Sequence, residues 1–242
     1  MYKFSLIILI FIFTNTNCIA QIESNKDWQV LIPSEGLDGW HYYQDKKSTK
    51  TGWSNENGVL TFNSSFKKGT KDNSLVTDKK FKSFKIYFEW KVSPGGNSGF
   101  MWGVNEDHKY THPFSTGPEI QILDITYSDG SIPSPKHSAG ALYDLIAPEK
   151  NVNKKAGEWN SFLITIDHIK NYCEVIHNGT KVSKFKLSGD DWDKMVKNSK
   201  FSNYDDKSFA HGDFGKFKTG HLVIQDHPGI ISYRNMKILE LN

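Results

Sequence analysis

Two carboxylates frame the segment Glu119-Ile120-Gln121-Ile122-Leu123-Asp124, with the amide of Gln121 between them. Paired carboxyl groups suit acid–base chemistry on an acetal, because one can donate a proton while the other attacks or activates water. Exposed acids on a strand are also common. The spacing alone therefore indicates a candidate site and does not yet define a reaction.

Two further segments supply a proton carrier and hydrogen-bonding groups. Gln225-Asp226-His227 places an acid beside an imidazole, which titrates near neutrality. In Pro94-Gly95-Gly96-Asn97-Ser98-Gly99 the glycines let backbone approach a ligand, and Asn97 and Ser98 can hydrogen-bond hydroxyl groups. Each segment also has the composition of an ordinary turn, and that alternative stays open.

Side-chain alternation predicts which of these groups share a face of a sheet. Successive side chains of a strand point to opposite faces. Glu119 therefore shares a face with Gln121, and His221 shares one with Gln225 and His227. Strands that carry acids, amides and imidazoles opposite an apolar face predict a polar groove lined by a sheet. The pattern does not say that these strands are neighbours.

The elements that would position these groups are mostly strands, because short β-type runs recur between turn signals. Asn178-Gly179 between two alternating runs predicts a hairpin, and 190–200 has the apolar spacing of the one helix. The expected strands are 59–63, 84–92, 99–103, 119–125, 161–167, 171–177, 180–187, 221–225 and 231–241. Many evenly spaced strands and almost no helix predict an all-β fold, either a β-sandwich or a jelly roll.

Composition excludes several classes of protein. The chain has 242 residues, of which 14% are aromatic, and 30 Lys+Arg nearly balance 27 Asp+Glu. It is long enough for a large core, and its low net charge argues against a disordered chain. Its lysines are scattered, which argues against a nucleic-acid partner. Arg234 is the one arginine; we expect it to fix a substrate oxygen or a carboxylate, with structural pairing as the alternative.

The first residues have the features of a signal peptide. Lys3 is followed by an apolar run and then by the small residue Ala20. The run is shorter than the roughly 20 residues that span a bilayer, and no other stretch is long enough. We predict a signal peptide over 1–20 and a single domain over 21–242, exported to the periplasm or secreted. A lipoprotein anchored through Cys18 is the alternative.

A series of short motifs runs in order along nearly the whole mature chain. They are Gly39-Trp40, Gly58-Val59-Leu60, Phe88–Val92, Gly95–Gly99, Glu119–Asp124, Gly140–Pro148, Gly157–Asn160, Asn178-Gly179, Ser199-Lys200-Phe201, Gly220-His221, Gln225-Asp226-His227 and Tyr233–Ile238. In this order and spacing the chain resembles the 3-keto-disaccharide hydrolase family, whose members are exported bacterial proteins. The resemblance implies a concanavalin A-like β-sandwich with one short helix. The stretches 105–118 and 203–215 look long for the family, so the exact sugar stays open.

The resemblance implies an enzyme that cleaves 3-keto-glycosides or 3-keto-disaccharides. A partner, a sugar 3-dehydrogenase, first oxidises C3, and the ketone then acidifies the C2 proton. A base removes this proton, the C1 substituent leaves the resulting enolate, and water adds to the product. Such a reaction needs proton-transfer groups and a cationic or hydrogen-bonding group at the enolate oxygen.

Carried onto the matching positions, the resemblance implies Glu119 and His227 as the catalytic proton-transfer groups. The residues expected to bind substrate or stabilise charge are Asn97, Ser98, Trp102, Gln121, Tyr143, His221, Gln225 and Arg234. Three acids, Glu89, Asp124 and Asp226, are expected to orient partners or to bind a divalent cation. That cation is the one cofactor left open.

Two other functions stay open. The first is a conventional glycosidase with two carboxylates. The segment that begins at Glu119 is similar to the Glu-x-Asp-x-x-Glu strand of sandwich-fold glucanases, but Gln121 and Asp124 replace two of its acids. The second is a sugar-binding module without catalysis, in which aromatic platforms in an open groove would bind the sugar.

Overall fold

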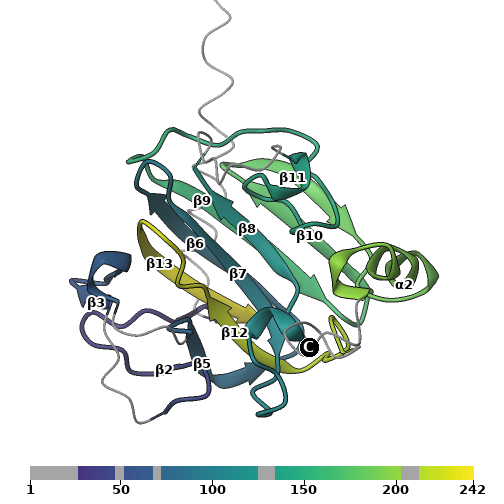
Figure 1. The fold of residues 1–242 in the computed structure, drawn as a ribbon, viewed down its shortest axis with the longest axis horizontal. Helices are drawn as coiled ribbons and strands as arrows, with labels where there is room; N and C mark the ends of the chain where they lie inside the picture. Colours follow the sequence, from purple (N-terminus) through teal and green to yellow (C-terminus); the bar gives the residue numbers. More distant parts are fainter. Residues whose placement is uncertain (1–26, 47–51, 68–71, 125–133, 203–212) are drawn as a thin grey trace, which may run out of the picture.

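Two antiparallel sheets pack face to face and build the fold (Figure 1). The computed structural model describes residues 27–46, 52–67, 72–124, 134–202 and 213–242. The expected signal peptide and Cys18 lie outside these residues.

The larger sheet has eight strands among the described residues. Their spatial order is β11-β10-β9-β6-β13-β4-β3, and β1 pairs with β13. The strands are β1 (Gln29–Val30), β3 (Trp53–Glu56), β4 (Val59–Asn63), β6 (Phe84–Val92), β9 (Asn160–Asp167), β10 (Tyr172–His177), β11 (Thr180–Phe185) and β13 (Ile230–Glu240).

The second sheet has five strands in the described part of the chain, in the order β2-β5-β12-β7-β8. The strands are β2 (Trp40–Tyr42), β5 (Leu75–Phe81), β7 (Asn97–Val104), β8 (Glu119–Leu123) and β12 (Gly220–Ile224). Figure 1 shows β7, β8 and β12 side by side. The segments that carry most of the candidate acids, amides and imidazoles are therefore neighbours in space.

Large aromatic side chains fill the space between the two sheets. Phe88 of β6 is fully buried, and its ring lies 5.6 Å from that of Phe100 in β7 and 6.0 Å from that of Tyr233. Burial of such rings dominates the energetics of a core. Because alternate residues of β7 and β8 face this core, the residues between them must face outward.

Trp102 belongs to this core and does not reach the outer face. Its side chain is 3% exposed and packs among the core residues between the sheets. Its neighbour Met101 packs in a separate apolar cluster with Val223. The expected role of Trp102 in substrate binding is therefore wrong, because the alternation of β7 places its indole on the inner face.

The turns and helix follow local sequence preferences. Asn178 and Gly179 have φ angles of 49° and 77°, as the two central residues of a type I′ hairpin turn require. Helix α2 (Asp190–Lys197) is shorter than the expected 190–200 and buries Trp192. Four 3-10 turns are described, namely η1 (Ser64–Phe66), η2 (Pro113–Ser115), η3 (Pro135–His137) and η4 (Lys200–Ser202).

The all-β sandwich is confirmed, and each expected strand is present with small shifts at its ends. Strands β1, β2, β3 and β5 were not expected. β1 has two residues, and β5 contains a run of three charged residues before Phe81 that breaks the alternation. In the described residues, no helix has the length and hydropathy that crossing a bilayer would need.

We expect Trp102→Ala to destabilise the fold by about 3–5 kcal/mol, because it leaves a large cavity in the core. The free energy of unfolding measured in urea tests this. Phe66→Ala is the control, because Phe66 is 67% exposed, and should change stability by less than about 0.5 kcal/mol. Unchanged stability of Trp102→Ala would contradict the core assignment.

Candidate active site

A pocket of about 160 Å³ opens on the outer face of the five-stranded sheet. Its walls come from β7 and β8, from the segment that follows β12, and from the turns and loops that carry Phe114, Tyr143 and Lys200. The lining residues are Asn97, Phe114, Glu119, Gln121, Tyr143, Lys200, Phe201, Gln225 and His227. Glu119 and His227, the expected catalytic pair, thus line one pocket together with four of the expected substrate-binding residues.

Among the described residues that line this pocket, Glu119 is the one carboxylate. It is 7% exposed. Burial raises the pKa of Glu119 to about 8, and the positive charge of Lys200 offsets only part of this effect. The group is therefore mostly protonated at neutral pH, the state that a general acid needs.

Gly99 makes the space in which the Glu119 carboxyl group sits. Gly99 of β7 pairs with Gln121 of β8. A Cβ atom added to Gly99 would lie 2.5 Å from Cδ of Glu119 and would overlap its Oε1. The absence of a side chain at Gly99 therefore leaves room for the carboxyl group of Glu119. From the sequence, we expected the glycines of this segment to let backbone approach a ligand instead.

Hydrogen-bonding side chains surround the imidazole. Asn97 Nδ2 lies 3.4 Å from His227 Nε2. An amide nitrogen only donates, so this contact fits a neutral His227 with its lone pair on Nε2. Asn97 Oδ1 is buried and accepts no hydrogen bond from the described residues. Gln121 and Gln225 add two more amides, which can bind the hydroxyl groups of a sugar.

Tyr143 and Lys200 form a wall beside Glu119. The backbone N–H of Tyr143 donates to the carbonyl oxygen of Glu119 at 2.9 Å. The Lys200 ammonium lies 4.1 Å from the centre of the Tyr143 ring. Tyr143 thus contacts both groups, Glu119 through its backbone and Lys200 through its ring.

Three lining residues had no predicted role, namely Phe114, Lys200 and Phe201. Phe114 lies on η2, while Lys200 and Phe201 lie on η4, and such short turns have no periodicity to detect. The motif Ser199-Lys200-Phe201 was nevertheless a signal, because it is one of those that carry the family resemblance.

Ser98 lies beneath the pocket and is fully buried. Its hydroxyl donates to the Gln225 carbonyl oxygen at 2.7 Å and is 2.7 Å from the Tyr233 hydroxyl on the other sheet. The expected contact of Ser98 with substrate is wrong, because its side chain points inward and links the two sheets.

Arg234 lies on the larger sheet and pairs with Glu89, its partner across the strands. Its Nε and Nη2 atoms both lie 2.7 Å from Glu89 Oε2, and its guanidinium group lies 4.1 Å from the centre of the Trp159 ring. Arg234 thus fixes a structural carboxylate. Its expected role in substrate binding is wrong for this pocket.

His221 faces outward on β12 but belongs to another cluster. Its Nδ1–H donates to the Thr77 carbonyl oxygen at 2.6 Å, and its Nε2 lies 3.6 Å from Glu106 Oε2. His41 Nε2 lies 2.8 Å from the same carboxylate. Burial lowers the pKa of His221. It does not line the pocket, so its expected contact with substrate there is not found.

The three acids expected to orient partners or bind a cation lie in separate places. Asp124 accepts the Gly95 N–H at 2.9 Å, and Asp226 lies 2.5 Å from the Lys67 ammonium and accepts from Ser74. Glu89 is on the other sheet. Within the described ranges, no group of three His, Cys, Asp or Glu residues suits a metal ion.

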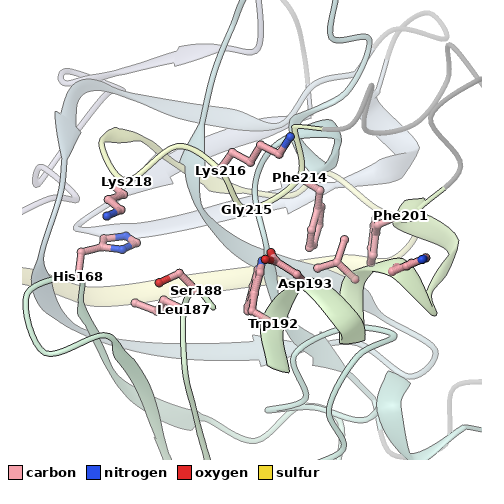
Figure 2. Close-up of a pocket in the computed structure, with 12 residues that line it drawn as sticks. His168, Leu187, Ser188, Trp192, Asp193, Phe201, Phe214, Gly215, Lys216 and Lys218 are labelled. Atoms are coloured by element: carbon pink, nitrogen blue, oxygen red, sulfur yellow. The ribbon is translucent and has the colours of Figure 1, made fainter. Parts of the chain in front are cut away.

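A larger groove of about 530 Å³ lies between α2 and the segment before β12 (Figure 2). It is lined by none of the expected site residues. Its members are His168, Leu187, Ser188, Trp192, Asp193, Val196, Lys197, Phe201, Phe214, Gly215, Lys216 and Lys218. Asp193, the one carboxylate among these described lining residues, is exposed. The smaller pocket is the better candidate active site, because it alone places a protonated acid beside an imidazole and amides.

The sandwich and its acid–imidazole pocket define a class, the glycoside-cleaving enzymes built on a β-sandwich. Residues 27–239 match the family model described as a 3-keto-alpha-glucoside-1,2-lyase-like domain. The chain therefore belongs to the 3-keto-disaccharide hydrolase family, and the resemblance found in the sequence is confirmed.

Similar proteins are found in Bacteroides thetaiotaomicron and Parabacteroides distasonis. The chain is 29% identical over 233 residues to a 3-keto-disaccharide hydrolase of Bacteroides thetaiotaomicron, covering 88% of this chain and 78% of that protein. A crystal structure of a putative glycosyl hydrolase from Parabacteroides distasonis is 29% identical, with a TM-score of 0.77, and covers 90% of this chain and 95% of that one. A second from the same organism is 26% identical, with a TM-score of 0.62 and coverage of 90% and 100%.

We expect Gly99→Ala to lower kcat/KM for glycoside cleavage by about 100-fold, because the added Cβ displaces the Glu119 carboxyl group, and small misplacements are that costly. Steady-state kinetics measure this effect. The fold should persist, since the clash is with the end of a side chain. Unchanged kcat/KM would show that the position of Glu119 does not matter. Gly157→Ala is the control, because nothing lies within 4 Å of its added Cβ. Its φ of 86°, unlike the φ of Gly99, adds backbone strain, so this variant should lower stability and leave kcat/KM unchanged.

We expect Arg234→Ala to leave kcat/KM unchanged and to lower stability by about 1 kcal/mol or less, as for other partly exposed ion pairs. Thermal unfolding and steady-state kinetics together test this. A large rise in KM would restore Arg234 as a substrate-binding residue.

Proposed function

We propose that this protein cleaves the glycosidic bond of 3-keto-glycosides or 3-keto-disaccharides by elimination and hydration. The observation that carries the proposal is the buried Glu119, with a pKa of about 8, in a pocket that His227 also lines. Membership of the 3-keto-disaccharide hydrolase family and the name of the Bacteroides relative support it.

The chemistry begins at the ketone. A C3 ketone acidifies the C2 proton, whose removal breaks the C2–H bond and leaves an enolate. Collapse of the enolate breaks the bond between C1 and the glycosidic oxygen, which departs with a proton. Water then adds its hydroxyl to C1 and a proton to C2, so that the net reaction consumes one water.

The pocket offers one group for each proton transfer. Protonated Glu119 donates to the departing oxygen, since its proton is available at neutral pH. His227, which lines the same pocket, accepts the C2 proton. The amides of Gln121 and Gln225 bind sugar hydroxyl groups.

The alternatives are less well supported. A conventional glycosidase places two carboxyl groups about 5–5.5 Å or 6.5–9.5 Å apart across the sugar, and one of the described lining residues is a carboxylate. A binding module has no use for a buried protonated acid.

The proposal also implies a supplier and a compartment. A 3-keto substrate requires prior oxidation of C3, which we assign to a sugar 3-dehydrogenase. The apolar leader over residues 1–20 supports export to the periplasm or secretion.

Incubation with a 3-keto-disaccharide and with its unoxidised parent tests the function. We expect cleavage of the keto sugar alone. Glu119→Gln should lower kcat by about 10²–10⁴-fold, because it removes general acid catalysis, whereas Glu158→Gln, an exposed control, should not. Cleavage of both sugars would identify a conventional glycosidase, and cleavage of neither would indicate a binding module.

The pH profile gives a second readout of the same assignment. The raised pKa of Glu119 keeps its carboxyl group protonated up to a pH of about 8 in the free enzyme. Activity that needs this proton should therefore fall as the pH rises past about 8, seen as the basic limb of kcat/KM. Loss of activity on the acid side alone would contradict a donor role.

A further inference from the structure

The enolate that this chemistry forms carries a negative charge on the C3 oxygen, and a nearby positive charge would lower the barrier to its formation. The one arginine is not available, because Arg234 is engaged by Glu89 on the other sheet. Among the described residues that line the pocket, Lys200 has the one permanent positive charge.

We propose that the Lys200 ammonium binds the C3 oxygen of a 3-keto sugar and stabilises its enolate, and that Tyr143 positions Lys200. This inference rests on the proposed function, which it deepens by naming the group that selects for a ketone over an alcohol at C3.

The place of Lys200 in the fold supports this role. It is the first residue of η4, just after α2, and its side chain lines the pocket. Its Nζ lies 4.1 Å from the centre of the Tyr143 ring and 5.5 Å from that of Phe201. Contact with rings holds an ammonium in place without neutralising it, so the charge remains free to act on an oxygen.

Tyr143 connects this ammonium to the acid. Its backbone N–H donates to the carbonyl oxygen of Glu119 at 2.9 Å, which holds the backbone of Tyr143 against β8. Its ring also stacks on His137 at 4.7 Å, and His137 in turn lies 3.1 Å from Asp144. Ring and strand together set the position of the ammonium beside Glu119.

The ammonium of Lys200 is close enough to the carboxyl group of Glu119 to influence its pKa, and both groups line the same pocket. The charge of Lys200 lowers the pKa of Glu119, against the larger effect of burial. The two groups then serve opposite ends of one elimination. The ammonium stabilises charge that develops on the C3 oxygen, and the carboxyl group protonates the oxygen that leaves C1.

The experiment uses a 3-keto-glucoside that carries deuterium at C2. It measures the deuterium released into water, as the total lost from the remaining substrate and the product together. Wild type should release it and cleave the bond. Lys200→Met should slow release by about 10²–10³-fold, the usual loss for one oxyanion-stabilising group, and Lys200→Arg should keep part of it. Glu119→Gln should lose cleavage and yet retain more release than Lys200→Met. Lys197→Met, an exposed lysine of the preceding helix, is the matched control and should behave as wild type.

Tyr143 is tested as a positioning residue. Tyr143→Leu should lower kcat more than it raises KM, and Tyr143→Phe, which keeps the ring, should lose much less. Both Lys200→Met and Tyr143→Leu should move the basic limb of the pH profile upward, because the charge that lowers the pKa of Glu119 is removed or displaced.

The outcomes separate the two proposals. No cleavage of the keto sugar by wild type overturns the proposed function and this inference with it. Cleavage by wild type with near-normal deuterium release in folded Lys200→Met overturns the role of Lys200 and leaves the function standing. Equal losses in Tyr143→Leu and Tyr143→Phe overturn the positioning role of the ring.

Discussion

The burial of one protonated carboxyl group is the constraint on which the candidate site depends. Glu119 fits against β7 because Gly99 has no side chain, and it holds its proton because the pocket excludes most water from it. Tyr143 is bound to its carbonyl oxygen. Beneath the pocket, a hydrogen bond between the hydroxyl groups of Ser98 and Tyr233 links β7 to the opposite sheet. The position of Glu119 and the contacts that hold it there therefore depend on the same pairing of strands.

Alternation within strands carried most of what could be predicted about the fold and the site. It correctly separated Glu119 and Gln121 from the core-facing isoleucines of β8, because the period of a strand is local. Gln225 and His227 follow the end of β12 and still reach the same pocket. The same rule would have assigned Trp102 to the core. The hypothesis that aromatic rings bind sugar led to the wrong assignment.

Arrangement between distant strands could not be predicted from the sequence. The pairing of Arg234 with Glu89 depends on β13 lying beside β6, and the capture of His221 by Glu106 depends on a loop 115 residues earlier in the chain. Lys200 was overlooked for a related reason. A lysine on a short turn has no periodicity, and its importance appears once the turn is placed beside β8.

The stacked rings of Trp192, Phe214 and Phe201 run from the helix to the pocket. Phe201 and Phe214 lie 4.0 Å apart, Trp192 and Phe214 lie 6.3 Å apart, and Phe201 lines the pocket itself. The part of the pocket wall that Phe201 forms is therefore supported by packing against the short helix α2 and not by the sheets. Helices of this length are marginal by themselves. On heating, the protein should lose turnover when α2 frays, at a temperature below that at which the sandwich melts.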